Sequence, residues 1–209
     1  WSMLSGTYHT KIAIGLFNIY KILKRKKYLE LAKKIIKNSK KQQSKNGMFP
    51  STKFHTNLHP HCYSAEGIWV AAKLNKSKSL FNSVISSVNW VKSNMKDNIP
   101  ARLVFFKKKK NYNYRADSIS QFLRLLILLK IDNKILLENS LVYSLFSIIK
   151  KNLSRSNLKL FKGGFFWGYN SNGKKNYGIN IWTTIFILQT IIYYKNLNLK
   201  KKINPFHII

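Results

Sequence analysis

The sequence has one cysteine, six acidic residues and no long apolar run, and these shortages exclude several classes of protein. The single cysteine, Cys62, excludes a disulfide framework and a cysteine-based zinc finger. Residues 122–129 and 185–194 are the longest apolar stretches, and they are too short or too interrupted to cross a bilayer, which takes about 20 residues. Residues 2–4 do not resemble a signal peptide, because they are not a charged region followed by an apolar core. Because 45% of the residues are hydrophobic and 14% are aromatic, the chain can still bury a core.

The charge is strongly one-sided, because 38 basic residues face six acidic ones and give a net charge of +32. Only five of the basic residues are arginine, so the excess is lysine. Codon bias in an A/T-rich genome would produce this composition, and so would selection for a polyanion-binding surface. The lysines run through the whole chain and no nucleic-acid-binding motif accompanies them. We therefore predict no specific nucleic-acid partner, and both interpretations of the charge stay open.

Apolar residues recur at three- and four-residue steps through most of the chain, which predicts helices. The fifth segment is apolar almost all round, which is typical of a buried helix. Ser77 is expected to cap the start of the fourth. No segment alternates over the length of a strand, so the sequence predicts an all-α fold. The seven expected helices cover residues 12–23, 28–36, 61–74, 80–95, 116–131, 133–153 and 179–194.

Short and long connections alternate between these helices. The short ones predict antiparallel hairpins, and hairpins that begin every 50 to 60 residues indicate a repeat. The long connections, at residues 44–58, 98–113 and 156–176, are of a length that is usually functional. We therefore predict one domain of helical hairpins at residues 1–196, followed by a basic tail at residues 197–209.

Four segments carry a resemblance to a known superfamily. Residues 43–49, QSKNGMF, are similar to the Q-x-x-x-G-x-W repeat of terpenoid cyclases, with Phe49 in the tryptophan position. Residues 163–169, GGFFWGY, are similar to the glycine–aromatic loops that precede inner helices in α/α toroids. Residues 59–67 and 115–121 resemble the starts of inner helices in the carbohydrate-active branch. The aspartate-rich motifs of the cyclases are absent.

The chain as a whole thus resembles the α/α-toroid superfamily, which includes six-hairpin glycosidases, polysaccharide lyases, sugar epimerases and terpenoid cyclases. The resemblance implies an α/α toroid of antiparallel hairpins. Complete toroids have five to seven hairpins, whereas three and a half are expected here, so the chain resembles a partial toroid. Since it begins at Trp1 without an initiator Met, we expect it to be a piece of a longer protein that lacks N-terminal hairpins.

In a ring of antiparallel hairpins the odd-numbered helices all start at one end, and the candidate functional residues fall at those starts. Glu66 and Asp117 occupy corresponding places on adjacent inner helices, and they are the expected proton-transfer pair. The structural alternative for Asp117 is a favourable charge at a helix N-terminus. His61 and Tyr63 are the alternative proton carriers. The expected substrate-binding residues are His9, His59, Arg115, Gln121, Trp167, Tyr169, Asn180 and Trp182.

No metal or other cofactor is predicted. His55, His59 and His61 are close in sequence, but they have no obvious carboxylate ligand beyond Glu66. The aromatic loop at residues 165–169 suits the face of a sugar ring, and it would equally suit a hydrophobic plug in the mouth of the barrel.

The resemblance implies a carbohydrate-active protein that binds or acts on an oligo- or polysaccharide, with uronic acids as one candidate. Whether the chain is an enzyme is open; an enzyme would be a polysaccharide hydrolase, lyase or epimerase. The alternative is a non-catalytic helical-repeat scaffold that binds a protein or a polyanion. A third hypothesis, that the chain is an isoprenoid-binding toroid, depends on residues 43–49 alone.

Overall fold

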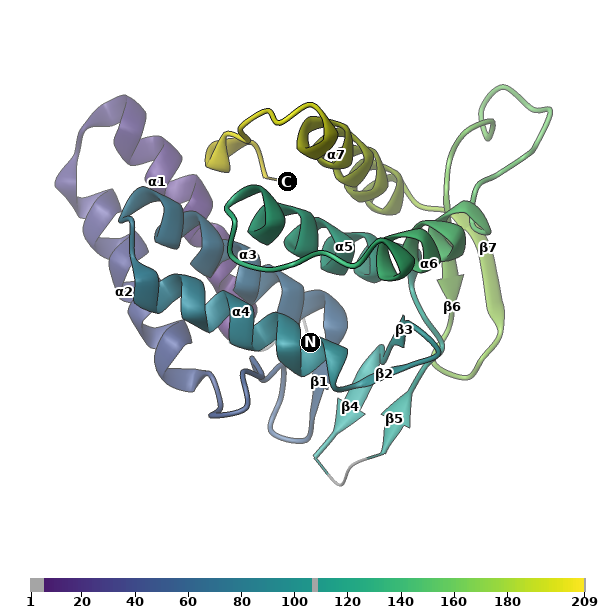
Figure 1. Cartoon of the computed structure of the whole chain (residues 1–209), viewed down its shortest axis with the longest axis horizontal. Coiled ribbons are helices and arrows are strands. Elements are labelled where there is room, and N and C mark those ends of the chain that lie inside the picture. Colours follow the sequence, from purple (N-terminus) through teal and green to yellow (C-terminus); the bar gives the residue numbers. More distant parts are fainter. Residues whose placement is uncertain (1–5, 107–108, 209) are drawn as a thin grey trace. The chain divides into compact units, whose positions relative to one another are not determined.

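The computed structural model describes residues 6–106 and 109–208, which form two compact units. Unit 1 contains residues 6–93, 105–106 and 204–208, and unit 2 contains residues 94–104 and 109–203. Both consist of helices joined by loops that carry short strands (Figure 1). The described chain is therefore all-α in its framework, as the sequence predicts.

Unit 1 is built around one buried helix. Helix α3 packs against α4 and against the 3-10 helix η1, and α1 packs against α2. Nearly every residue of α3 is buried, including Ile68 and Trp69. The predicted cap is confirmed, because the Ser77 hydroxyl accepts a hydrogen bond from the Leu80 amide. The elements of this unit are η1 (Thr7–Lys11), α1 (Ile12–Leu23), α2 (Lys26–Gln42), β1 (His55–Asn57), α3 (Leu58–Leu74), α4 (Lys78–Lys92) and the 3-10 helix η2 (Pro205–His207).

Unit 2 repeats this plan around a second buried helix. Helix α5 is buried from Ala116 to Leu129, as its uniformly apolar sequence predicts, and it packs chiefly against α7 (Figure 1). Strands β2 and β3, β4 and β5, and β6 and β7 pair as antiparallel hairpins. The elements are β2 (Met95–Lys96), β3 (Ile99–Pro100), β4 (Leu103–Phe105, its last residue in unit 1), β5 (Lys110–Asn111), α5 (Ala116–Ile131), α6 (Asn139–Lys150), β6 (Phe166–Tyr169), β7 (Lys175–Ile179) and α7 (Ile181–Asn198).

The structure differs from the sequence prediction at several helix ends. Helix α6 begins at Asn139 and not at residue 133, because Asn133 has a left-handed backbone (φ 53°) that ends the turn after α5. The expected tail is partly folded: α7 continues to Asn198, and η2 lies against α1, where Asn18 donates a hydrogen bond to the Phe206 carbonyl. The short strands escaped prediction because strands of two to five residues are too brief to show alternation.

The cyclase-like segment forms a structural loop. The Gln43 side chain donates hydrogen bonds of 2.9 Å to the carbonyls of Gly47 and Ser83. Gly47 has φ 93°, and a Cβ there would lie 2.1 Å from the Ser86 carbonyl oxygen. Phe49 fills the tryptophan position and is fully buried. The loop that follows α2 is therefore held against helix α4 by Gln43 and Gly47, with Phe49 buried beneath it.

Within the described ranges, 6–106 and 109–208, no helix has the length and apolar character required to pass through a lipid bilayer.

Candidate functional site

The carboxylate of Glu66 lies in unit 1 beside a lysine that the sequence did not single out. Glu66 is 0% exposed, and Lys11 at the end of η1 donates to its Oε2 at 2.5 Å. Gly67 permits this approach, because a Cβ there would lie 2.3 Å from the carbonyl oxygen of Thr10. The ammonium group offsets the cost of burying the carboxylate.

Three of the predicted aromatic residues surround this ion pair or the start of its helix. The Lys11 ammonium lies 5.2 Å from the centre of the Tyr63 ring, which in turn lies 4.4 Å from the His59 ring. His9 contacts Tyr8 at a ring distance of 4.5 Å in η1. Unit 1 thus brings Glu66, Tyr63 and His59 into one cluster around Lys11, and it places His9 on the adjoining 3-10 helix.

His61 is buried, and both of its ring nitrogens have backbone partners. It is 1% exposed, its Nδ1 accepts a hydrogen bond from the Phe49 amide, and its Nε2 lies 3.1 Å from the Ser87 carbonyl oxygen. This arrangement defines a neutral imidazole with the proton on Nε2. Burial lowers the pKa of His61 to about 4, although the hydrogen bond with the Ser87 carbonyl opposes the shift. Both ring nitrogens are in use, so we leave His61 out of the proposed catalytic set.

In unit 2, a glycine brings the aromatic loop against the start of α5. Gly168 has φ 116°, and a Cβ there would lie 2.7 Å from the Tyr114 carbonyl oxygen. The Tyr169 amide donates to the same carbonyl at 2.9 Å. This contact places the Trp167 ring 4.4 Å from the guanidinium carbon of Arg115. The indole Nε1 is buried, and no described residue accepts a hydrogen bond from it.

Arg115 in turn holds the second candidate carboxylate. Its Nε donates to Asp117 Oδ1 at 3.0 Å, and its Nη2 donates to Oδ2, so the pair is bidentate. The Ser118 amide also donates to Asp117 Oδ1, at 2.7 Å. Asp117 is therefore a helix N-terminal charge, as the structural alternative proposed, and simultaneously part of a charged cluster with Trp167.

A second arginine, absent from the predicted set, adjoins this cluster. Arg102 donates to the Tyr169 carbonyl at 2.7 Å. Burial lowers the pKa of the Arg102 guanidinium, the charge of Arg115 lowers it further, and Asp117 opposes both effects. Two guanidinium groups therefore share the surroundings of one carboxylate, and the cluster keeps an excess of positive charge.

The other predicted residues of unit 2 have different surroundings. Gln121 is fully buried one turn along α5, so in this conformation no solute can reach it. Asn180 caps α7, because its Oδ1 accepts a hydrogen bond from the Thr183 amide at 3.0 Å. Trp182 is exposed, with its ring 6.3 Å from that of Phe186. Unit 2 brings Arg115, Asp117, Trp167 and Tyr169 together, and Asn180 has a structural role.

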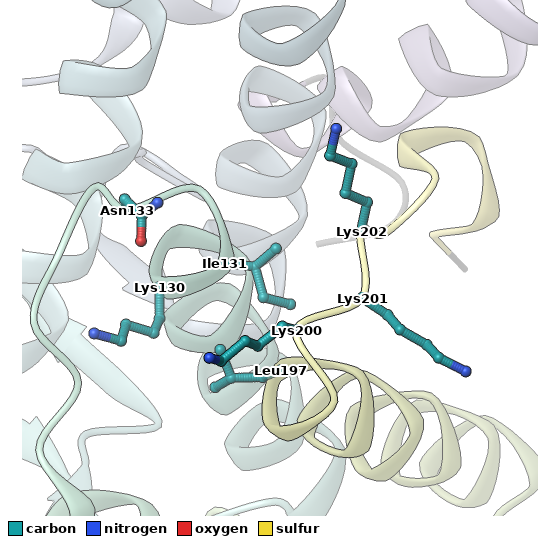
Figure 2. Close-up of a pocket in the computed structure, with 7 residues that line it drawn as sticks. All are labelled: Lys130, Ile131, Asn133, Leu197, Lys200, Lys201 and Lys202. Carbon is teal, nitrogen blue, oxygen red and sulfur yellow. The ribbon is translucent and has the colours of Figure 1, made fainter.

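Lysines line a pocket of about 490 Å³ near the ends of α5 and α7. Figure 2 shows that their side chains leave it in different directions, so the ammonium groups do not converge on one point. Cations near helix C-termini are favourable without a ligand. The lining consists of Lys130, Ile131, Asn133, Leu197, Lys200, Lys201 and Lys202.

Among the described residues, no three histidine, cysteine or acidic side chains lie close enough together to hold a metal ion. His55, one of the three neighbouring histidines, lies 3.3 Å from the Thr52 hydroxyl.

Several solved structures share this architecture. D-mannose isomerase superposes with a TM-score of 0.71 and 12% identity, over 94% of this chain and 58% of its own. A glycosyl hydrolase of family 88 from Bacteroides vulgatus superposes with a TM-score of 0.70 and 8% identity, over 92% of this chain and 62% of its own. Cellobiose 2-epimerase from Bacillus thermoamylovorans superposes with a TM-score of 0.66 and 13% identity, over 88% of this chain and 52% of its own. The fold is therefore that of a partial, six-hairpin glycosidase-like α/α toroid.

The chain thus spans between about half and just under two thirds of the length of these three proteins. No protein-family model matches the sequence, and no curated protein matches it significantly. At such low identities the likeness concerns the fold.

Proposed function

We propose that the chain binds an oligo- or polysaccharide at the Trp167–Arg115–Asp117 cluster of unit 2. The observation that carries this proposal is the Arg115 guanidinium lying over the Trp167 ring while it holds Asp117 in a bidentate pair. Sugars present apolar ring faces beside hydroxyl groups. An aromatic ring can stack on the apolar face of a sugar, and charged donors and acceptors beside it can hydrogen-bond the hydroxyl groups. The similar solved structures support the class of ligand, because all three are named as enzymes of carbohydrates.

An acidic sugar fits the cluster better than a neutral one. Arg102 and Arg115 supply two positive charges and Asp117 supplies one negative charge. A uronate carboxylate would neutralise the remaining positive charge, and a planar guanidinium can bind a carboxylate through two hydrogen bonds.

If the chain is an enzyme, Glu66 and Asp117 are the proposed proton-transfer residues, with Tyr63 as a further proton carrier; Glu66 and Tyr63 belong to unit 1, and Asp117 belongs to unit 2. Each carboxylate has a cationic partner, Lys11 for Glu66 and Arg115 for Asp117. Both carboxylates are buried, so proton transfer by either one requires its ion pair to open toward the substrate. Turnover would then disappear in both Glu66→Gln and Asp117→Asn, whereas binding would remain in Glu66→Gln.

Calorimetry with a panel of neutral and uronic-acid oligosaccharides tests the proposal. A salt concentration of about 0.3 M suppresses nonspecific attraction to the lysines, because it shortens the Debye length to well under 10 Å. We expect one uronic-acid class to bind and Trp167→Ala to abolish the binding. Phe54→Ala is the matched control, since it removes an exposed aromatic side chain of unit 1.

Binding of every polyanion alike, short duplex DNA included, with no effect of Trp167→Ala would support the scaffold alternative. The isoprenoid alternative would require Gln43→Ala to alter ligand binding; the hydrogen bonds of Gln43 to two backbone carbonyls instead support a role in stability.

A further inference from the structure

The loop between α6 and β6 carries exposed apolar and basic side chains together. Leu158 is 64% exposed, Leu160 is 85% exposed and Phe161 is 41% exposed. Single apolar side chains on a surface are ordinary, whereas a contiguous group of them marks an interaction site. We call this segment the 155–162 loop; its sequence is RSNLKLFK, and its basic residues, all of them exposed, are Arg155, Lys159 and Lys162.

Backbone hydrogen bonds within unit 2 hold the shape of this loop. The Ser154 amide donates to the Gly164 carbonyl at 2.8 Å and closes the base of the loop. Further out, the Leu158 carbonyl accepts hydrogen bonds from the amides of Phe161 and Lys162, at 2.9 and 3.0 Å. Figure 1 shows the loop extending away from α6 and β6. The apolar side chains are therefore exposed on a turn that the fold holds in place.

The charge of the loop has one sign. Glu138 is the last acidic residue of the sequence, so residues 139–209 contain basic side chains and no acidic ones. Three positive charges thus lie among three exposed apolar side chains, and no carboxylate in the loop offsets them. A fitting partner offers negative charge and an apolar interior at the same place.

A lipid bilayer that contains anionic lipids offers this combination. Its headgroups attract lysine and arginine, and the acyl chains beneath them accept apolar side chains. Lysines of an inserted loop can extend back to the headgroups. Single-stranded nucleic acids fit less well, because their bases stack on aromatic rings and two of the three apolar side chains are leucine.

We propose that the 155–162 loop inserts into the surface of a membrane that contains anionic lipids. The leucines and the phenylalanine would enter the boundary of the acyl chains, while the three basic side chains would bind the headgroups. This interaction goes beyond the proposed saccharide binding and does not depend on it.

Cosedimentation with lipid vesicles tests the proposal. We expect the chain to bind vesicles of phosphatidylcholine with about 30% phosphatidylserine far more tightly than vesicles of phosphatidylcholine alone. Salt at about 0.3 M weakens the attraction of the lysines outside the loop. Under these conditions Leu160→Ser/Phe161→Ser should weaken binding by about 10-fold or more, because two apolar side chains no longer enter the bilayer. Leu136→Ser is the matched control, since Leu136 is also 85% exposed and lies outside the loop.

A second pair of variants separates the charges of the loop from the net charge of the chain. Lys159→Gln/Lys162→Gln and Lys200→Gln/Lys201→Gln each remove two of the 38 basic residues. At about 0.1 M salt, each lysine at the membrane surface strengthens binding about fivefold, so the loop variant should bind about 25-fold more weakly. The variant outside the loop should lose much less. Equal losses would indicate nonspecific adsorption through lysine and would overturn the proposal.

A fluorescent label on the loop reports insertion directly. Asn157 is exposed, so in a Cys62→Ala background the dye NBD can be attached to Asn157→Cys with all three apolar side chains retained. Its emission should shift to the blue when anionic vesicles are added, whereas the same dye on Leu136→Cys should not respond. Circular dichroism checks that every variant is folded.

Four results would overturn the proposal. They are the absence of binding to anionic vesicles, binding that Leu160→Ser/Phe161→Ser leaves intact, a label at residue 157 that does not shift, and a larger shift with single-stranded DNA than with vesicles. The last result would assign the loop to nucleic acid. None of these outcomes depends on saccharide binding.

Discussion

Replacing His61 by glutamine should change how the stability of the protein depends on pH. The folded pKa of His61 is about 4, whereas the ordinary value is 6.5. Between these values the unfolded chain binds a proton that the folded protein does not. The contribution of His61 is therefore fully present above pH 6.5 and is lost as the pH falls toward 4.

The size of this effect follows from the two pKa values. Each pH unit between them corresponds to about 1.4 kcal/mol, so the whole interval removes about 3 kcal/mol from the free energy of unfolding. Glutamine cannot take up this proton. It can keep a donor for the Ser87 carbonyl, but it leaves the Phe49 amide without its acceptor, which lowers stability at pH 7 by about 1–3 kcal/mol.

Urea unfolding followed by tryptophan fluorescence measures both quantities. The free energy of unfolding should be determined at several values between pH 7 and pH 4 for the parent and for His61→Gln. Carboxylates and other histidines titrate in both proteins, so the difference between the two curves isolates His61. The parent should lose about 3 kcal/mol more than His61→Gln as the pH falls, so that the two curves meet or cross. Parallel curves would refute the burial of a neutral imidazole at this position.

Three other substitutions test the contacts that build the site, each by chemical denaturation. Lys11→Met should lower stability by about 3–5 kcal/mol, because it leaves the Glu66 carboxylate buried without its ion pair, and adding Glu66→Gln should restore much of the loss; no recovery would contradict the pairing. Gly168→Ala should lower stability by about 1–3 kcal/mol, because of its positive φ and the close Tyr114 carbonyl; an unchanged value would count against that contact. Gln43→Ala should lower stability by about 1–3 kcal/mol through the loss of two part-buried hydrogen bonds to backbone carbonyls, and unaltered saccharide binding in this variant serves as its control.

Helix periodicity predicted the framework well, because burial on one or all sides leaves a strong signal. Helix α5 begins and ends where the apolar segment 116–131 does. Glu66 and Asp117, which the sequence singled out near helix starts, both have cationic partners, and their role in proton transfer stays a prediction. The sequence could not show that the described chain divides into two units, because that division depends on contacts between distant residues.

The partners of the carboxylates were harder to find. Lys11 is one of many lysines in the sequence and nothing in its neighbourhood marks it; its role depends on the close approach that Gly67 allows. Arg102 follows a strand too short to be predicted. His61 has the spacing of a functional histidine, but two backbone groups from distant loops and helices occupy its nitrogens.

The most direct test of the proposed saccharide site is the indole N–H spectrum of the protein. The chain has five tryptophans, and the resonance that disappears in Trp167→Phe identifies Trp167. On addition of the uronic-acid oligosaccharide that binds by calorimetry, we predict that this resonance shifts most, and that Arg115→Met reduces the shift. A shift confined to the exposed Trp182, or none at all, would contradict a saccharide site at the Trp167–Arg115–Asp117 cluster.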